Sequence, residues 1–189
     1  MSTWIDIIGS FIIGAIIILL IANLNLFINS TSADNLAVNI AQLNLKTTAE
    51  ILENDFYKIG FRVSGDAIAV ADSDRFKFYA DINDNNVKDT VYYYSGTVSE
   101  MASSDNPDDR PLYRVVGNET PEKVSIVTAF NLTYFDSTGA ELNYASLSSQ
   151  TQRNLIRIIE IYCKVESQEQ VDGAYQAAEW KRKIAPKNL

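Results

Sequence analysis

The chain has 189 residues, of which 47% are hydrophobic, and 24 acidic against 16 basic residues give a formal net charge of -8. This balance argues against nucleic acid as a partner, because phosphates repel an acidic chain. The sequence has no histidine, which excludes a serine–histidine hydrolase triad and removes the commonest metal ligand, and the single cysteine, Cys163, excludes an intrachain disulfide. We therefore expect a non-enzymatic protein without an organic cofactor.

Residues 1–25 form an apolar segment of membrane-spanning length. The run over residues 7–22 is interrupted only by Gly9, Ser10 and Gly14. With Trp4 included, it spans about 28 Å as a helix, close to the roughly 30 Å of a bilayer core. A cleaved signal peptide would need a cation before this run and a small-residue cleavage site after it, and neither occurs. We expect a retained membrane helix, which the sequence barely orients because the first Lys or Arg is Lys46.

Residues 26–58 continue the helix as an amphipathic half. Helical spacing places one set of apolar or small residues on a single face, which we expect to cover the rest of the protein: Leu36, Ile40, Leu43, Thr47 and Ile51. Gly60 is the first plausible terminator. The polar stretch 29–35 leaves an alternative open, in which the helix breaks and a second one starts with an N-cap at Ser32 or Asp34.

Residues 59–189 are predicted to form a β-sheet head. Segments with period-2 alternation and many aromatic or β-branched residues lie at 76–82, 89–96, 111–117, 124–136 and 154–167, and the tail after residue 173 is a candidate closing strand. Short polar turns between them favour an antiparallel sheet with one face covered. Cys163 lies on the apolar face of the last segment and is predicted to be a buried thiol. The predicted fold class is α+β, a long N-terminal hydrophobic helix packed on an antiparallel sheet.

This order of elements resembles the type IV pilins, and most closely the minor pilins and pseudopilins. The segments that carry the resemblance are ENDFYKIGF (53–61), FKFYADINDNNVKDTVYYY (76–94), PLYRVV (111–116), FNLTYFDSTG (130–139) and LIRIIEIYCKVE (155–166). The typical pilin has a Glu at position five of the mature chain, where this chain would have Asp6 if Met1 were removed. The resemblance implies a structural filament subunit that waits in the inner membrane as a monomer and then joins an extracellular or envelope-spanning filament with copies of itself and other pilin-like subunits.

Asp6 is the main candidate for an assembly residue. A carboxylate within an apolar helix is costly, and intramembrane acids tend to be functional. In a bundle of such helices the N-terminal ammonium of a neighbouring subunit is the available cation, and this pair would fix the axial register. The alternative is an interfacial acid favoured by the helix dipole. Trp4, Gly9 and Gly14 complete the candidate assembly set, and the two glycines allow close helix approach although they lack GxxxG spacing.

A second candidate site lies in ADINDNNVKDT (80–90). The oxygen ligands of a calcium loop would come from Asp81, Asn83, Asn85, Asp89 and the carbonyl of Val87. Position six is Asn86 instead of Gly, and position twelve is Tyr92 instead of Glu. A hairpin turn built on Asn and Asp is therefore the competing interpretation.

Two functions of different class follow. The first is a filament subunit held by its N-terminal helix in a helical bundle. The second is a monomeric, membrane-anchored extracytoplasmic binding or sensor domain. They differ in whether the apolar helix finally contacts protein or lipid.

Overall fold

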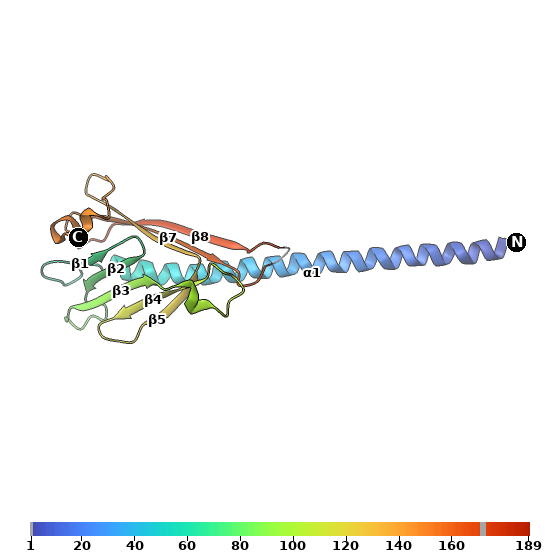
Figure 1. The fold of residues 1–189 in the computed structure, drawn as a ribbon, viewed down its shortest axis with the longest axis horizontal. Coiled ribbons are helices and arrows are strands. Elements are labelled where there is room, and N and C mark those ends of the chain that lie inside the picture. The colour runs from blue at the N-terminus through green and yellow to red at the C-terminus, as the bar shows by residue number, and fades with distance from the viewer. Residues whose placement is uncertain (1, 171–172) are drawn as a thin grey trace.

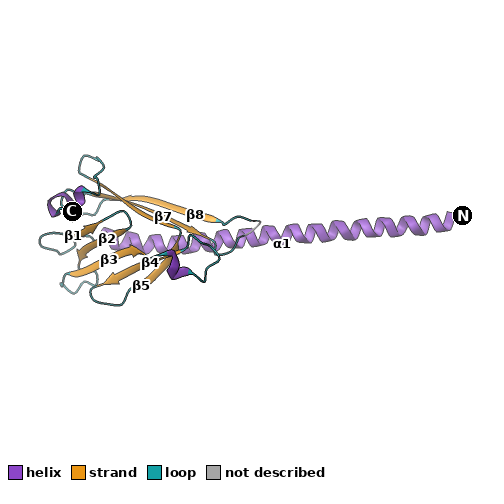
Figure 2. Cartoon of the chain, viewed as in Figure 1, coloured by secondary structure: helices purple, strands orange, loops and turns teal. Residues whose placement is uncertain are grey.

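The computed structural model describes residues 2–170 and 173–189, in which one long helix precedes eight strands (Figures 1 and 2). The helix is α1 (Ser2–Tyr57), and a single-turn helix, α2 (Gln150–Arg153), lies late in the chain. The strands are β1 (Ile68–Ala71), β2 (Arg75–Ala80), β3 (Asp89–Ser95), β4 (Arg110–Val116), β5 (Glu122–Val127), β6 (Ala129–Phe135), β7 (Ile158–Glu166) and β8 (Ala177–Ile184). The predicted α+β class is confirmed.

Helix α1 is continuous over 56 residues, which corresponds to about 84 Å. The predicted alternative, a break at 29–35 with a new N-cap at Ser32 or Asp34, is wrong. Ser30 shows how the polar stretch stays helical, because its hydroxyl donates to the carbonyl of Phe27 one turn earlier (3.1 Å). After Tyr57 the chain turns, and Gly60 adopts a φ of +76° that favours glycine.

The strands form two antiparallel sheets, not one. The first has the order β1-β2-β3-β4-β5 and the second the order β6-β7-β8. Figure 1 shows the C-terminal half of α1 running between these sheets, while its N-terminal half extends alone from the head. The expected closing strand in the tail is β8, which pairs with β7 from Ile159↔Ile184 to Glu166↔Ala177.

The segment predicted as one strand over 124–136 is two strands that belong to different sheets. The chain bends at Thr128, so that β5 pairs with β4 and β6 pairs with β7. Alternation of apolar residues continues in the same phase across the bend, so the pattern contained no sign of it. Strand β1 was also missed, because four residues are too few for a clear alternation.

The predicted strand 154–167 begins later than expected. Strand β7 starts at Ile158, and Leu155, which was assigned to the apolar face, is 45% exposed in the turn before it. Along β7 itself, alternate residues are buried as predicted, and Cys163 is among them.

The core lies where α1 meets the two sheets. The residues of α1 that are buried there are Ala41, Leu45, Thr48, Ala49, Leu52, Asp55 and Phe56. The ring of Phe56 lies 5.2 Å from that of Phe76 and 5.8 Å from those of Phe78 and Tyr93, measured between centroids. This aromatic cluster fixes the end of α1 against β2 and β3, and so sets the direction in which the rest of the helix leaves the head.

Candidate functional site

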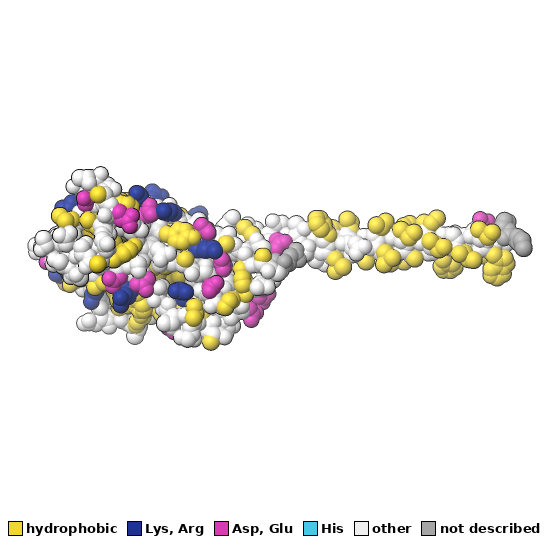
Figure 3. Space-filling model, turned by 45° about the horizontal axis from the view of Figure 1, so that its top comes forward, with side chains coloured by type: hydrophobic (Ala, Val, Ile, Leu, Met, Phe, Trp, Pro, Cys, Tyr) yellow, Lys and Arg dark blue, Asp and Glu magenta, His cyan; other side chains and the backbone are white. Residues whose placement is uncertain are grey.

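The N-terminal half of α1 has no cover within the chain. Large hydrophobic side chains from Trp4 to Ile28 are between 49% and 75% exposed. Figure 3 shows them as an apolar column projecting from the head. The helix has the length and composition to span a membrane.

The four candidate assembly residues do not form one cluster. Asp6 and Gly9 are three positions apart and share a side of α1, whereas Trp4 and Gly14 lie on other sides. A Cβ atom added at Gly9 or Gly14 would meet nothing within 4 Å. Ser10 donates its hydroxyl to the backbone carbonyl of Asp6 at 2.8 Å, which leaves the Asp6 carboxylate outside that bond. The nearest Lys or Arg along the helix is Lys46, about 60 Å away.

The amphipathic half of α1 packs on the head with a different face from the one predicted. Leu36, Ile40 and Leu43 are 61%, 51% and 64% exposed, Thr47 is also exposed, and Ile51 is half-buried. The buried face follows smaller residues instead, with Ala41, Leu45, Thr48 and Leu52 at steps of three and four. Sequence reasoning chose the larger side chains, but both sets have helical spacing. The structure thus leaves an apolar stripe, Leu36–Ile40–Leu43, open on the outside of the head.

A groove of about 410 Å³ borders this stripe where the strands β5 and β7 end beside α1. Its apolar lining includes Ala33, Leu36, Ala37, Ile40, Ile126 and Val165. Glu166 and Glu169 form an acidic rim. Burial acts to raise the pKa of Glu166, but hydrogen bonds from Lys164 and Asn106 outweigh it and lower that pKa, so this rim residue is ionised at neutral pH.

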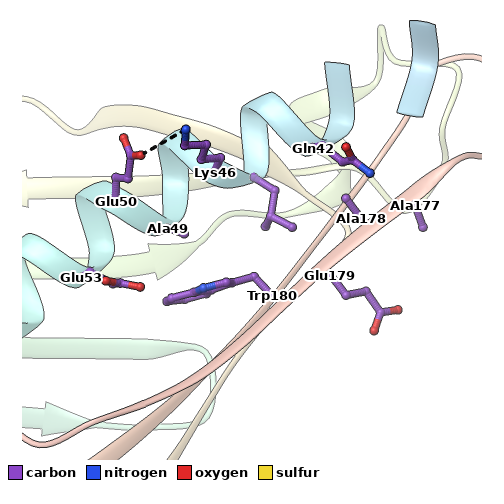
Figure 4. Close-up of a pocket in the computed structure, with 10 residues that line it drawn as sticks. Gln42, Lys46, Ala49, Glu50, Glu53, Ala177, Ala178, Glu179 and Trp180 are labelled. Carbon is purple, nitrogen blue, oxygen red and sulfur yellow. Dashed lines mark ion pairs between the residues drawn. The ribbon is translucent and has the colours of Figure 1, made fainter. Parts of the chain in front are cut away.

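A second groove, of about 550 Å³, lies on the other flank of α1, beside the open edge of β8. Figure 4 shows Trp180 lying under α1 near Ala49 and Glu53, with Gln42 further along the same side of the helix. Lys46 and Glu50 form an ion pair at its rim, at 3.9 Å, and both side chains are largely exposed. The two grooves therefore differ in character, the first with an apolar wall and the second with charges of both signs.

The predicted calcium loop forms a tight hairpin turn between β2 and β3. The buried carboxylate of Asp81 accepts hydrogen bonds from the amides of Asn85 (3.0 Å) and Asn86 (2.9 Å) and from the Arg62 guanidinium (3.0 Å). The other three side chains also accept backbone amides: Asn83 from Asn85, Asn85 from Val87, and Asp89 from Ile82.

These bonds match what a turn built on Asn and Asp requires, and Asp84 and Asn86 have φ values of 61° and 64°. Burial opposes the charged form of Asp81, but the donors around it lower the pKa of the carboxyl below 3.8. Within residues 2–170 and 173–189, no three Asp, Glu or Cys side chains gather in a way that could hold a metal ion. Calcium binding by Asn side chains and the Val87 carbonyl in this loop stays a prediction.

Sequence reasoning missed a buried ionic cluster between α1 and the first sheet. Asp55, 2% exposed, accepts hydrogen bonds at one carboxylate oxygen from the Tyr93 hydroxyl (2.7 Å) and from the Arg114 guanidinium (2.6 Å). Burial raises the pKa of Tyr93, and the neighbouring Asp55 charge adds to it. The signal was present in the sequence, because Asp55 follows Leu52 by three positions and so lies on the buried face of α1.

Comparisons with protein-family models, with curated proteins and with solved structures gave no match. The function is therefore inferred from the residues of this chain.

Proposed function

We propose that this protein is a non-catalytic structural subunit of a type IV pilus-like filament, pilin or pseudopilin in kind. The monomer is stored in the inner membrane through the N-terminal half of α1. It then enters an extracellular or envelope-spanning filament, in which that half packs among copies of itself and other pilin-like subunits.

The observation that supports this proposal is the length of the uncovered apolar surface on α1. Exposed large hydrophobic side chains begin at Trp4 and continue to Leu43. These positions are about 60 Å apart, roughly twice the thickness of a bilayer core. Lipid can cover only part of this surface, so the remainder favours a protein partner, as a helical bundle provides.

The alternative, a monomeric membrane-anchored binding or sensor domain, accounts for less of the molecule. It explains the exposed residues up to Ile28 but leaves Leu36, Ile40 and Leu43 facing water. A single-span anchor is also commonly followed by a cluster of Lys or Arg, whereas residues 23–45 contain neither.

Asp6 is proposed to set the axial register of the bundle. Near the membrane surface, headgroup water solvates its carboxylate. Inside a bundle that water is lost, and a buried carboxylate needs a cation or hydrogen-bond donors. The N-terminal ammonium of a neighbouring subunit can provide both, and only one stagger of the two helices brings the groups together.

The test replaces Asp6 by Ala in the full chain expressed in its natural host. We expect normal amounts of protein in the membrane fraction and no filaments in material sheared from the cells. Glu50→Ala is the matched control, because it removes a carboxylate from the same helix at an exposed position outside the apolar half. Electron micrographs that show parental numbers of filaments in Asp6→Ala cells would rule out the register role. Mass spectrometry of the N-terminus identifies the mature first residue.

A further inference from the structure

The acid-rimmed groove beside the stripe Leu36–Ile40–Leu43 requires an occupant that lipid cannot supply. When residues 4–22 span a bilayer, Ile40 lies about 27 Å beyond Ala22 along the helix. The apolar wall of the groove then faces water in a lone monomer. Burying it is favourable at about 25 cal/mol per Å² of apolar surface, so a partner with a matching apolar surface gains binding energy there.

The chain itself offers one segment that fits. Outside α1 the exposed large hydrophobic residues of the described chain are isolated: Val87, Val98, Tyr144 and Leu155. Only the N-terminal half of α1 presents a continuous apolar surface as long as the groove. That segment projects away from its own head (Figure 3), so it can reach the groove only on another copy.

Charge and side-chain size narrow the segment to residues 7–22. Glu166 and Glu169 at the rim repel Asp6, which places the seated segment on the C-terminal side of that acid. Residues 7–33 carry no charge. Gly14, near the middle of the segment, has open space around it and allows close approach to the small residues Ala33 and Ala37 on the groove wall.

We propose that this groove receives residues 7–22 of α1 from a second copy of the chain, with Gly14 facing Ala37 and Ile40. The inference rests on the proposed filament function and adds the surface of the head that holds the neighbour. The contact is heterologous, because a groove on one copy meets a helix segment on another, and it therefore propagates into an open polymer. For parallel helices the two copies are offset by about 35 Å along the axis, the rise over the positions between Gly14 and the groove centre.

The test is disulfide trapping in filaments sheared from cells that express the full-length Gly14→Cys/Ile40→Cys variant. Both positions accept cysteine without loss of packing, since Gly14 has nothing within 4 Å and Ile40 is 51% exposed. Within one chain the two positions are about 39 Å apart, so a disulfide between them must join two copies. The matched control is Gly14→Cys/Gln42→Cys, because Gln42 lines the other groove. The native Cys163 is buried and common to both variants.

We expect a ladder of covalent multimers on oxidation for the 14/40 pair and at least tenfold less for the 14/42 pair. As a second measurement, Ile40→Lys should lower the yield of filaments at least tenfold, whereas Gln42→Lys should leave it unchanged. Filaments that form normally but show no ladder, or the same ladder in both pairs, would overturn the groove contact and leave the filament function standing. Absence of filaments from cells with the parent chain would overturn both.

Discussion

Asp55 is predicted to hold the C-terminal half of α1 in the head, and the substitution Asp55→Ala tests this directly. The carboxylate is 2% exposed and bonded to both Tyr93 and Arg114, whose side chain is itself 19% exposed. Removing one partner of a buried ion pair costs about 3–5 kcal/mol, because the other charge is left uncompensated. Since water reaches part of Arg114, we expect the lower end, about 3 kcal/mol of the free energy of unfolding. For a chain of this size that corresponds to a fall in Tm of roughly 10 °C.

The assay is thermal unfolding of the full chain in detergent, followed by circular dichroism. Glu50→Ala is the control, because its pair with Lys46 is long and exposed and should contribute less than about 0.5 kcal/mol. Replacing both partners, as in Asp55→Leu/Arg114→Met, should restore part of the loss, since no charge is then left alone. A fall in Tm of less than 3 °C for Asp55→Ala, or no recovery in the double variant, would refute the role assigned to the cluster.

Two further predictions concern single groups in the head. Burial raises the pKa of the Cys163 thiol to about 12, so iodoacetamide at pH 8 should leave the folded protein unmodified and label it only in urea, as mass spectrometry can measure. The pKa of Asp81 is lowered in the folded state, so its contribution to stability is present above the ordinary value of 3.8 and is lost as the pH falls through the folded value. The Tm of the parent should therefore fall more steeply in acid below pH 4 than that of Asp81→Asn, and equal slopes would contradict the assignment. If the loop 81–89 also binds calcium, the ion raises the Tm of the parent and Asp81→Ala abolishes the rise, whereas no response in the parent leaves the hairpin turn alone.

The long helix and most strands were predictable because each carries a local signal. The apolar run after Asp6 and the turn at Gly60 bracket α1, and alternation in β2, β3 and β7 identifies their buried faces. The division into two sheets was not predictable, since the bend at Thr128 preserves the phase of alternation. Strand pairing between distant segments is decided by packing, which a local pattern does not contain.

The buried face of α1 is the most informative failure. Hydrophobicity favoured Leu36, Ile40 and Leu43, yet the head packs on Ala41, Thr48 and their neighbours. Small residues let two sheets approach the helix from both sides, which large side chains would prevent. A helix with two apolar faces thus has two partners to satisfy, and a sequence read for a single head assigns the larger residues to it. Asp55 was missed for the same reason, because on the correct face it is the one acid that the core must neutralise.

The two faces of α1 also explain how such a chain can stay monomeric before it assembles. The net charge of -8 makes copies repel one another over about 10 Å in physiological salt. The apolar stripe gains energy only on direct contact, because burial of surface acts at the range of a water molecule. Random encounters between heads are therefore unfavourable, while an encounter that seats one helix beside the stripe of another brings apolar surface together along its whole length. Selectivity for ordered assembly then comes from the same exposed leucines and isoleucine that the head leaves uncovered.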